Sequence, residues 1–168
     1  MEKKWWHHLT AYQIYTRSFC DSNGDGIGDF QGIISKLDYL QELGIGAIWI
    51  SPFNDSPNYD NGYDISDYYA ILKDFGTMAD LEKMIQECEK RDIIVMMDLV
   101  LNHCSHEHPW FLEACKDRNG KYHDYYIWEE GTEDQPPEGS AAFFGGNVWE
   151  WVPQQASALC DRNIRASD

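Results

Sequence analysis

Three short apolar runs alternate with two segments of helical period along the first hundred residues. The runs cover residues 11–15, 45–50 and 93–100. Runs of this length suit buried strands, and strands that alternate with helices are typical of βαβ units. The pattern therefore predicts an α/β fold in which these three strands are parallel.

The two helical segments carry their own start and stop signals. In the first, apolar residues at helical spacing lie between a predicted N-cap at Asp29 and a terminating glycine at Gly44. In the second, Thr77 is followed three residues later by Asp80, which is the spacing of a capping box. We expect this second helix to end near Arg91.

The rest of the chain is patterned less regularly. From about Cys104 onward it is aromatic and polar, and only residues 110–116 predict a short helix. The acidic, proline-bearing residues 129–138 are typical of a solvated loop. Residues 154–168 show neither a helical nor a strand period, so no element is predicted there.

Composition narrows the range of functions. The chain has 168 residues with 29 acidic and 13 basic side chains, a net charge of −16, which repels nucleic acid and anionic membranes. We therefore expect neither as a partner. No apolar stretch has the length of a membrane span, and the N-terminus lacks the apolar core of a signal peptide. The five cysteines are scattered without a C-x-x-C pair, which favours reduced thiols and a cytoplasmic protein.

Polar residues follow each predicted strand. Ligands of parallel α/β folds bind where the strands end, so these positions are candidates for the site. Arg17 follows the first strand, residues 58–64 form a polar loop after the second, and Asp98, Asn102 and His103 follow the third.

The loop over residues 21–29 places oxygen-bearing groups at every second position, with glycines between them. The candidate ligands are the side chains of Asp21, Asn23, Asp25 and Asp29 and the backbone carbonyl of Ile27. Such a set predicts a structural calcium site, with magnesium as an alternative. An EF-hand is disfavoured because Gly32 stands where its bidentate Glu belongs and a strand precedes the loop. The alternative is a turn that binds nothing.

Residues 60–64 and His103 suggest a sugar site. Asp60 and Tyr63 offer a carboxylate and a ring, which can accept hydrogen bonds from sugar hydroxyls and stack on a ring face. The alternative is an ordinary Asn-Gly turn with an exposed tyrosine. His103 is either a donor to a substrate hydroxyl or a histidine satisfied within the core. A zinc site from His103, Cys104, His106 and His108 is disfavoured by their close spacing.

Six motifs in a fixed order resemble the α-amylase superfamily of glycoside hydrolases, and within it the oligo-1,6-glucosidase and α-glucosidase branch. They are YQIYTRSF at 12–19, the aspartate-rich loop, GIGAIWISP at 44–52, DNGYDI at 60–65, DLVLNH at 98–103 and FFGGNVWEW at 143–151. The resemblance implies a (β/α)8 barrel with residues 1–103 as its N-terminal part and about three βα units. It further implies that residues 104–152 are part of a small domain inserted after strand 3, with an unmatched tail over 153–168.

The resemblance also implies roles for single residues. The pocket for a terminal glucose would be lined by Asp60, Tyr63, His103 and Phe144. Pocket support would come from Arg17, Asp98 and Asn102. Asp21, Asn23, Asp25, Ile27 and Asp29 match the calcium loop of the family. The chain departs from the family pattern at Thr16, Cys20 and Cys104.

The family's catalytic groups are not among these matches. Its retaining mechanism uses two carboxylates about 5–5.5 Å apart. By resemblance these follow strands beyond residue 168. We therefore expect the N-terminal portion of an α-glucosidase that is inactive alone and folds poorly alone, because three strands cannot close a barrel. The alternatives are a portion of a trehalose-6-phosphate hydrolase or a sucrose isomerase, or a non-catalytic calcium- or sugar-binding module.

Overall fold

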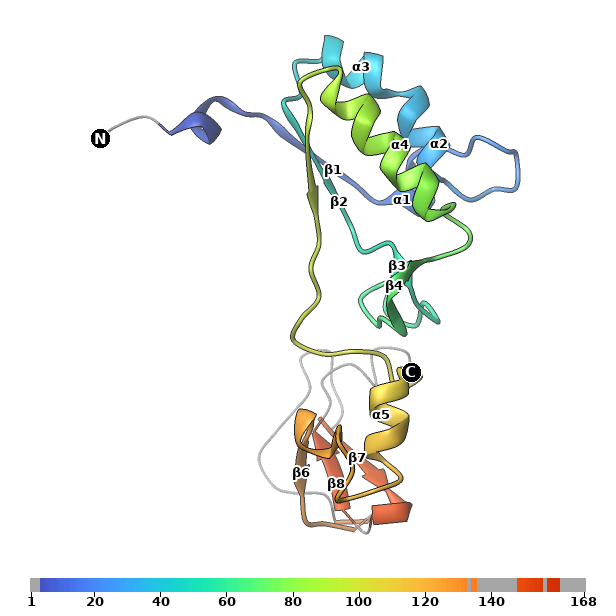
Figure 1. Cartoon of the computed structure of the whole chain (residues 1–168), viewed down its shortest axis with the longest axis vertical. Helices are drawn as coiled ribbons and strands as arrows, with labels where there is room; N and C mark the ends of the chain where they lie inside the picture. Colours follow the sequence, from blue (N-terminus) through green and yellow to red (C-terminus); the bar gives the residue numbers. More distant parts are fainter. Residues whose placement is uncertain (1–3, 133, 136–147, 156, 161–168) are drawn as a thin grey trace. The chain divides into compact units, whose positions relative to one another are not determined.

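The computed structural model describes residues 4–132, 134–135, 148–155 and 157–160, which belong to two compact units (Figure 1). The first unit comprises residues 1–55 and 68–99, and the second comprises residues 56–67 and 100–168.

A parallel sheet of three strands forms the centre of the first unit. Its strands are β1 (Ala11–Ile14), β2 (Ala47–Ile50) and β5 (Ile94–Met97), in the order β1-β2-β5. Ala47 of β2 is in register with Ala11 of β1 and with Ile94 of β5. The three predicted parallel strands are therefore confirmed, and their polar continuations leave the sheet at the same edge.

Helices cover this sheet and build its core. A 3-10 turn, η1 (Trp5–His8), precedes β1, and a single turn, α1 (Thr16–Phe19), follows it. The first predicted helix consists of two pieces, α2 (Phe30–Ser35) and α3 (Leu37–Glu42), because the backbone leaves helical geometry at Lys36. The second is α4 (Met78–Glu89). The buried core includes Ile14, Phe30, Ile33, Leu37, Leu40, Ile48, Ile50 and Met84.

The predicted helix signals act as expected. Asp29 accepts a hydrogen bond from the backbone N–H of Gly32 (2.6 Å) and so caps α2. Thr77 and Asp80 form the reciprocal capping box of α4. Gly44 has a φ of +81°, the left-handed geometry that lets a glycine terminate α3.

A small hairpin that the sequence pattern does not predict follows β2. It pairs β3 (Asn54–Asp55) with β4 (Asp67–Ile71). Two polar residues carry no strand period, so β3 has no signal of its own. Tertiary hydrogen bonds hold it instead: the Asn54 side chain donates to the carbonyl of Tyr68 (2.9 Å).

The second unit contains a short helix and an antiparallel sheet. The helix α5 (Pro109–Ala114) confirms the one predicted near residues 110–116, and η2 (His123–Tyr125) follows it. The sheet has the order β6-β8-β7, with β6 (Ile127–Glu129), β7 (Trp149–Val152) and β8 (Ser157–Cys160). A further 3-10 turn, η3 (Pro153–Gln155), links β7 to β8.

The expectation of no element over residues 154–168 is wrong at β8. This strand pairs with β6 on one side and β7 on the other. Its four residues gain their conformation from that pairing rather than from a pattern of their own, which explains why the sequence carries no signal. The predicted loop at 129–138 begins at the last residue of β6 and lies partly outside the described residues.

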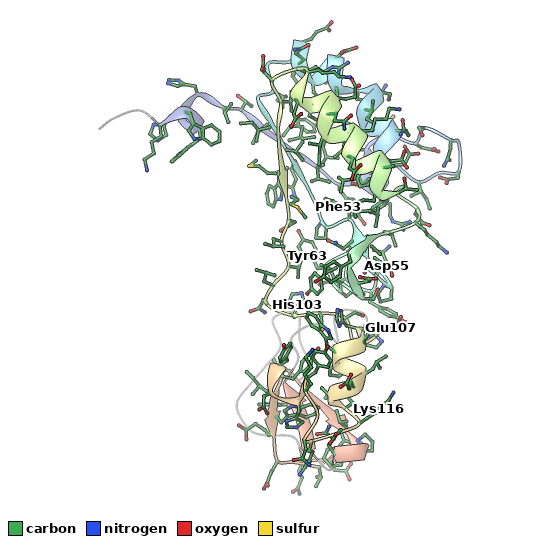
Figure 2. All side chains as sticks on the ribbon, in the orientation of Figure 1. Phe53, Asp55, Tyr63, His103, Glu107 and Lys116 are labelled. Atoms are coloured by element: carbon green, nitrogen blue, oxygen red, sulfur yellow. The ribbon has the colours of Figure 1, made fainter. Side chains whose placement is uncertain are left out.

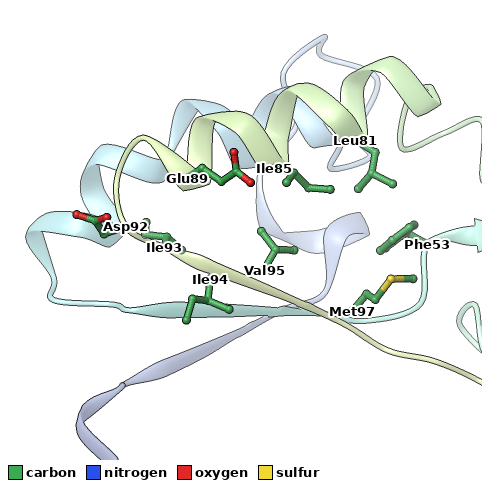
Figure 3. A pocket seen from close by; sticks show the side chains of 9 residues that line it. All are labelled: Phe53, Leu81, Ile85, Glu89, Asp92, Ile93, Ile94, Val95 and Met97. Carbon is green, nitrogen blue, oxygen red and sulfur yellow. The ribbon is translucent and has the colours of Figure 1, made fainter. Parts of the chain in front are cut away.

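The outer side of β5 leaves apolar surface uncovered in the first unit. Met97 is 51% exposed, and no strand pairs with the second edge of β5 within the described parts of the chain. An apolar groove of about 630 Å³ runs beside this strand, with Leu81 and Ile85 of α4 directed toward Val95 (Figure 3). Parallel sheets are normally covered on both faces, so this surface is incomplete. None of the described helices is long and apolar enough to cross a membrane.

Close backbone contact explains one glycine and predicts the effect of changing it. A Cβ atom at Gly32 would overlap the carbonyl oxygen of Cys20, at the start of the aspartate-rich loop. We expect Gly32→Ala to destabilise the fold by at least about 1–3 kcal/mol, because the backbone must shift. Thermal melting compared with Glu42→Ala, an exposed change on α3, checks this. Equal melting temperatures for the two variants would contradict it.

Candidate functional site

The loop that follows β3 is folded around one buried carboxylate, that of Asp64. Its side chain accepts hydrogen bonds from the hydroxyl of Ser56 (2.8 Å) and from the backbone N–H groups of Tyr59 (2.9 Å) and Asp60 (3.0 Å). Asp64 is only 3% exposed. The whole segment belongs to the second unit and is therefore held by its own contacts.

A tight turn carries the chain from Asp60 to Asp64. Asn61 and Gly62 have φ values of +52° and +95°, and the backbone N–H of Tyr63 donates to the carbonyl of Asp60 (2.9 Å). The Asn-Gly turn is thus present. It brings the Asp60 and Tyr63 positions back toward one another, so the turn and a sugar site are compatible interpretations of the same residues.

His103 connects the segment after β5 to this turn. Its Nε2 atom lies 2.9 Å from the carbonyl oxygen of Tyr63 (Figure 2). Because a carbonyl only accepts, Nε2 carries the proton and donates. Its Nδ1 atom lies 3.4 Å from the side-chain nitrogen of Asn102. A sugar hydroxyl would have to share the Nε2 proton with the Tyr63 carbonyl, so His103 also positions the turn.

The electrostatics of the site centre on Asp60. Its carboxyl group is half-buried, and the pKa of that group is raised first by burial and then by the negative charge of Asp64, while His103 acts in the opposite direction. A carboxylate that is partly withdrawn from water, next to an aromatic residue and an imidazole, can accept strong hydrogen bonds from hydroxyl groups. The structure thus brings Asp60, Tyr63 and His103 together.

The remaining predicted pocket residues are placed differently. Arg17 forms an ion pair with Asp74 (3.2 Å) in the first unit. Asp98 directly follows β5 in that unit, and its backbone N–H donates to the carbonyl of Ile50 (3.2 Å). Asn102 is exposed beside His103. Phe144 lies outside the described residues.

The contacts of the proposed zinc ligands do not support a zinc site. The His106 ring packs against Tyr59, with 5.2 Å between ring centres. His108 is buried, which lowers its pKa, and its Nδ1 atom accepts from the backbone N–H of Trp110 at the start of α5. Cys104 contacts the hydroxyl of Tyr126 (3.1 Å). These side chains are committed to separate partners.

The aspartate-rich loop curls around its own side chains. The Asp21 carboxylate accepts from the backbone N–H groups of Gly24 (2.7 Å) and Gly26 (2.8 Å), which lower its pKa. Asp25 accepts from the N–H of Ile27 (2.8 Å). Asp29 is buried and accepts from Ser22 as well as capping α2.

The donor set of this loop fits a hard cation in kind, since all its groups are oxygens. Across the described residues, however, no group of three His, Cys, Asp or Glu side chains is placed to hold a metal ion. Backbone N–H groups share these oxygens instead.

Sequence reasoning missed the organising role of Asp64 and Ser56. Both are buried polar residues in a loop. The only signal was two carboxylates four residues apart around an Asn-Gly turn, at Asp60 and Asp64. That spacing does not reveal which of the two is buried.

A parallel sheet of βα units, with polar residues in the chain segments that follow its strands, is the arrangement expected of the N-terminal part of a TIM barrel. The model for the catalytic domain of alpha amylase matches residues 13–158. The chain therefore belongs to the α-amylase family of glycoside hydrolases, as its motifs predicted.

Three relatives illustrate this membership. The oligo-1,6-glucosidase of Bacillus cereus is 57% identical over 151 residues, which are 90% of this chain and 27% of that enzyme. The crystal structure of isomaltulose synthase from Klebsiella sp. LX3 matches with a TM-score of 0.93 and 49% identity, over 96% of this chain and 29% of that one. The crystal structure of the trehalose-6-phosphate hydrolase of Bacillus licheniformis matches with a TM-score of 0.90 and 46% identity, over 95% of this chain and 29% of that one. The chain thus spans little more than a quarter of their length.

Proposed function

We propose that this chain is the N-terminal portion of a retaining α-glucosidase that hydrolyses short α-linked gluco-oligosaccharides, in the manner named for its oligo-1,6-glucosidase relatives. The single observation that carries the proposal is the turn at 60–63, which His103 ties to the segment after β5. In the proposal this turn holds the terminal glucose: Asp60 accepts from its hydroxyls and Tyr63 packs on its ring.

The chemical step requires groups that we assign to the rest of the enzyme. A retaining glycosidase needs a nucleophilic carboxylate and a second carboxyl that serves as acid and then base. In this proposal the present chain binds and orients the sugar, and the later barrel strands supply both catalytic groups. The uncovered edge of β5 and the groove beside it support this, because the next βα unit of a barrel packs at that place (Figure 3).

Two other activities of the same family are the second candidates. A trehalose-6-phosphate hydrolase and an isomaltulose synthase are among the structural neighbours. The net charge of −16 on this portion mildly opposes a phosphorylated sugar at long range. A non-catalytic calcium- or sugar-binding module is distinguished by tight glucose binding without turnover.

The test uses the complete enzyme, which here means this chain continued by the remaining barrel from its own gene or from the Bacillus cereus relative. We expect it to hydrolyse nitrophenyl α-glucoside and isomaltose faster than trehalose-6-phosphate, and to form no isomaltulose from sucrose. Preference for trehalose-6-phosphate, or isomerisation of sucrose, would replace the first proposal by the corresponding alternative.

We further propose that calcium is held by the aspartate-rich loop, with magnesium as the alternative. Asp21, Asn23, Asp25 and Asp29 would supply side-chain oxygens and Ile27 a carbonyl, which clamps the loop between β1 and α2. We expect millimolar calcium to raise the melting temperature of the chelator-treated complete enzyme by several degrees, since a ligand of the native state stabilises it by mass action. Asp21→Ala should abolish the rise, whereas Glu42→Ala should not.

The same measurement separates the outcomes for the metal. If the melting temperature rises with magnesium and not with calcium, the bound cation is magnesium. A rise that survives in Asp21→Ala would show that the cation binds elsewhere and would remove this loop from the proposal.

We also propose that the protein works in a reducing compartment, as a cytoplasmic enzyme does. Cys20, Cys88 and Cys115 are free thiols in the described part of the chain. Burial raises the pKa of Cys88 and of Cys115 to about 11, so both thiols stay protonated and unreactive at neutral pH. Alkylation of the native complete enzyme followed by peptide mapping should therefore leave the buried Cys88 unlabelled. Rapid labelling of Cys88 would contradict its burial.

A further inference from the structure

Asp64 performs a task that the predicted pocket residues do not cover. We propose that Asp64 is a positioning residue for sugar binding: its buried carboxylate holds the 56–64 loop in the shape that presents Asp60 to the substrate. This inference rests on the proposed function of that loop and adds to it a residue that does not itself contact the sugar.

The first argument is the number and direction of its hydrogen bonds. One oxygen of Asp64 accepts from the Ser56 hydroxyl (2.8 Å) and the backbone N–H of Asp60 (3.0 Å), and the other accepts from the N–H of Tyr59 (2.9 Å). The carboxylate therefore joins the beginning of the loop to the residue that binds the sugar. Its two oxygens each have an assigned donor, so rotation of the group is blocked.

The second argument is that the site requires a charged acceptor. All three groups that face Asp64 in these bonds are donors, and an amide in its place would direct an N–H₂ group at one of them. Asp64 is 3% exposed, so water does not replace a lost bond. A buried donor left unpaired costs more than the bond itself contributes.

The third argument is that the same network fixes the backbone at the start of the loop. Asn58 has a left-handed φ of +70°, a conformation that asparagine adopts more readily than most residues. The Ser56 hydroxyl, itself bound to Asp64, accepts from the N–H of Asn58 (2.9 Å). The network from Asp64 therefore stabilises the turn at Asn58.

The position of Asp64 also gives a readout that a merely structural role does not move. Among the described residues, two charged groups act on Asp60: Asp64, which disfavours its ionisation, and His103, which favours it. Removal of the Asp64 charge lowers the pKa of Asp60. The pH below which substrate binding weakens must then move to a lower value.

The experiment compares three variants of the complete enzyme with nitrophenyl α-glucoside as the substrate. Asp64→Asn should raise KM about 10-fold or more, the effect typical of charged hydrogen bonds, with kcat changed much less. It should also move the acidic limb of the pH profile for inhibition by glucose, which reports binding without chemistry, to lower pH. Ser56→Ala, which removes the hydroxyl's bonds to Asp64 and Asn58 and keeps the charge, should raise KM by a smaller factor and leave that limb in place. Asp60→Ala serves as the reference for loss of the sugar contact.

The outcomes separate this inference from the proposed function. If Asp60→Ala leaves KM unchanged, the proposed function of the loop fails. If Asp60→Ala raises KM while folded Asp64→Asn does not, or does so without moving the acidic limb, the positioning role of Asp64 is wrong. If Asp64→Asn does not fold, Ser56→Ala decides: a raised KM supports the network, and a wild-type KM overturns it.

Discussion

Asp60→Ala in the complete enzyme is expected to raise KM for nitrophenyl α-glucoside about 10- to 100-fold, the range for loss of a charge-assisted hydrogen bond. The carboxylate is half-buried in a turn that His103 and Asp64 hold in place. Its removal leaves the sugar hydroxyls without that acceptor, while the backbone of the turn keeps its own bonds. Steady-state kinetics measure the change directly.

The matched control is Asp25→Ala in the aspartate-rich loop. Asp25 is exposed and its carboxylate accepts from the N–H of Ile27, within the first unit. We expect Asp25→Ala to lower the melting temperature of the complete enzyme and to reduce the rise in melting temperature that calcium causes. KM should stay nearly unchanged. Equal effects of the two variants on KM, with no change in melting temperature, would reject this division of roles.

The pH dependence of the Asp60 contact follows from its raised pKa. Burial is the largest cause and the charge of Asp64 the second, so the carboxyl group takes up its proton at a higher pH than an ordinary aspartate. The ionised form accepts charge-assisted hydrogen bonds on both oxygens, whereas protonation turns one oxygen into a donor and removes the charge. Substrate affinity should therefore begin to fall above the usual titration range of aspartate as the pH is lowered, and this loss should be absent in Asp60→Ala.

The 168-residue chain by itself is expected to have no hydrolytic activity, which is the second large effect. In the proposal, both catalytic carboxylates belong to later strands of the barrel. The three-stranded sheet also leaves the outer side of β5 uncovered, with Met96 and Met97 exposed. Unpaired strand edges and uncovered apolar surface favour association, so we expect poor folding as well.

Two measurements on the purified 168-residue chain check this expectation. One is release of nitrophenol from nitrophenyl α-glucoside, and the other is thermal melting followed by circular dichroism. Turnover above that of Asp60→Ala in the same chain would contradict the assignment of the catalytic groups. A cooperative melt of a monomer would contradict the expected instability.

The sequence predicted the first unit well because its elements carry local signals. Asp29 caps α2, Thr77 and Asp80 form the box at α4, and Gly44 has the left-handed geometry that ends α3. Such signals act within a few residues along the chain. The break at Lys36 had no such signal, because apolar spacing continues through it from α2 into α3.

Elements that depend on distant partners were missed. The strand β3 has two polar residues and exists through its pairing with β4, and β8 exists through its pairing with β6 and β7. The site residues likewise divide into those with a signal in the sequence and those whose role depends on folding. Asp60, Tyr63 and His103 were predicted from residue type and position, whereas Asp64 was not, because its role depends on burial and on three donors folded around it.

The most direct test of the central claim is the activity of a hybrid in which this chain replaces the matching N-terminal part of the Bacillus cereus oligo-1,6-glucosidase, to which it is 57% identical over 151 residues. The account predicts a folded hybrid that hydrolyses isomaltose and loses most of its substrate affinity in Asp60→Ala. A folded hybrid without activity, or one whose KM is indifferent to Asp60→Ala, would contradict it.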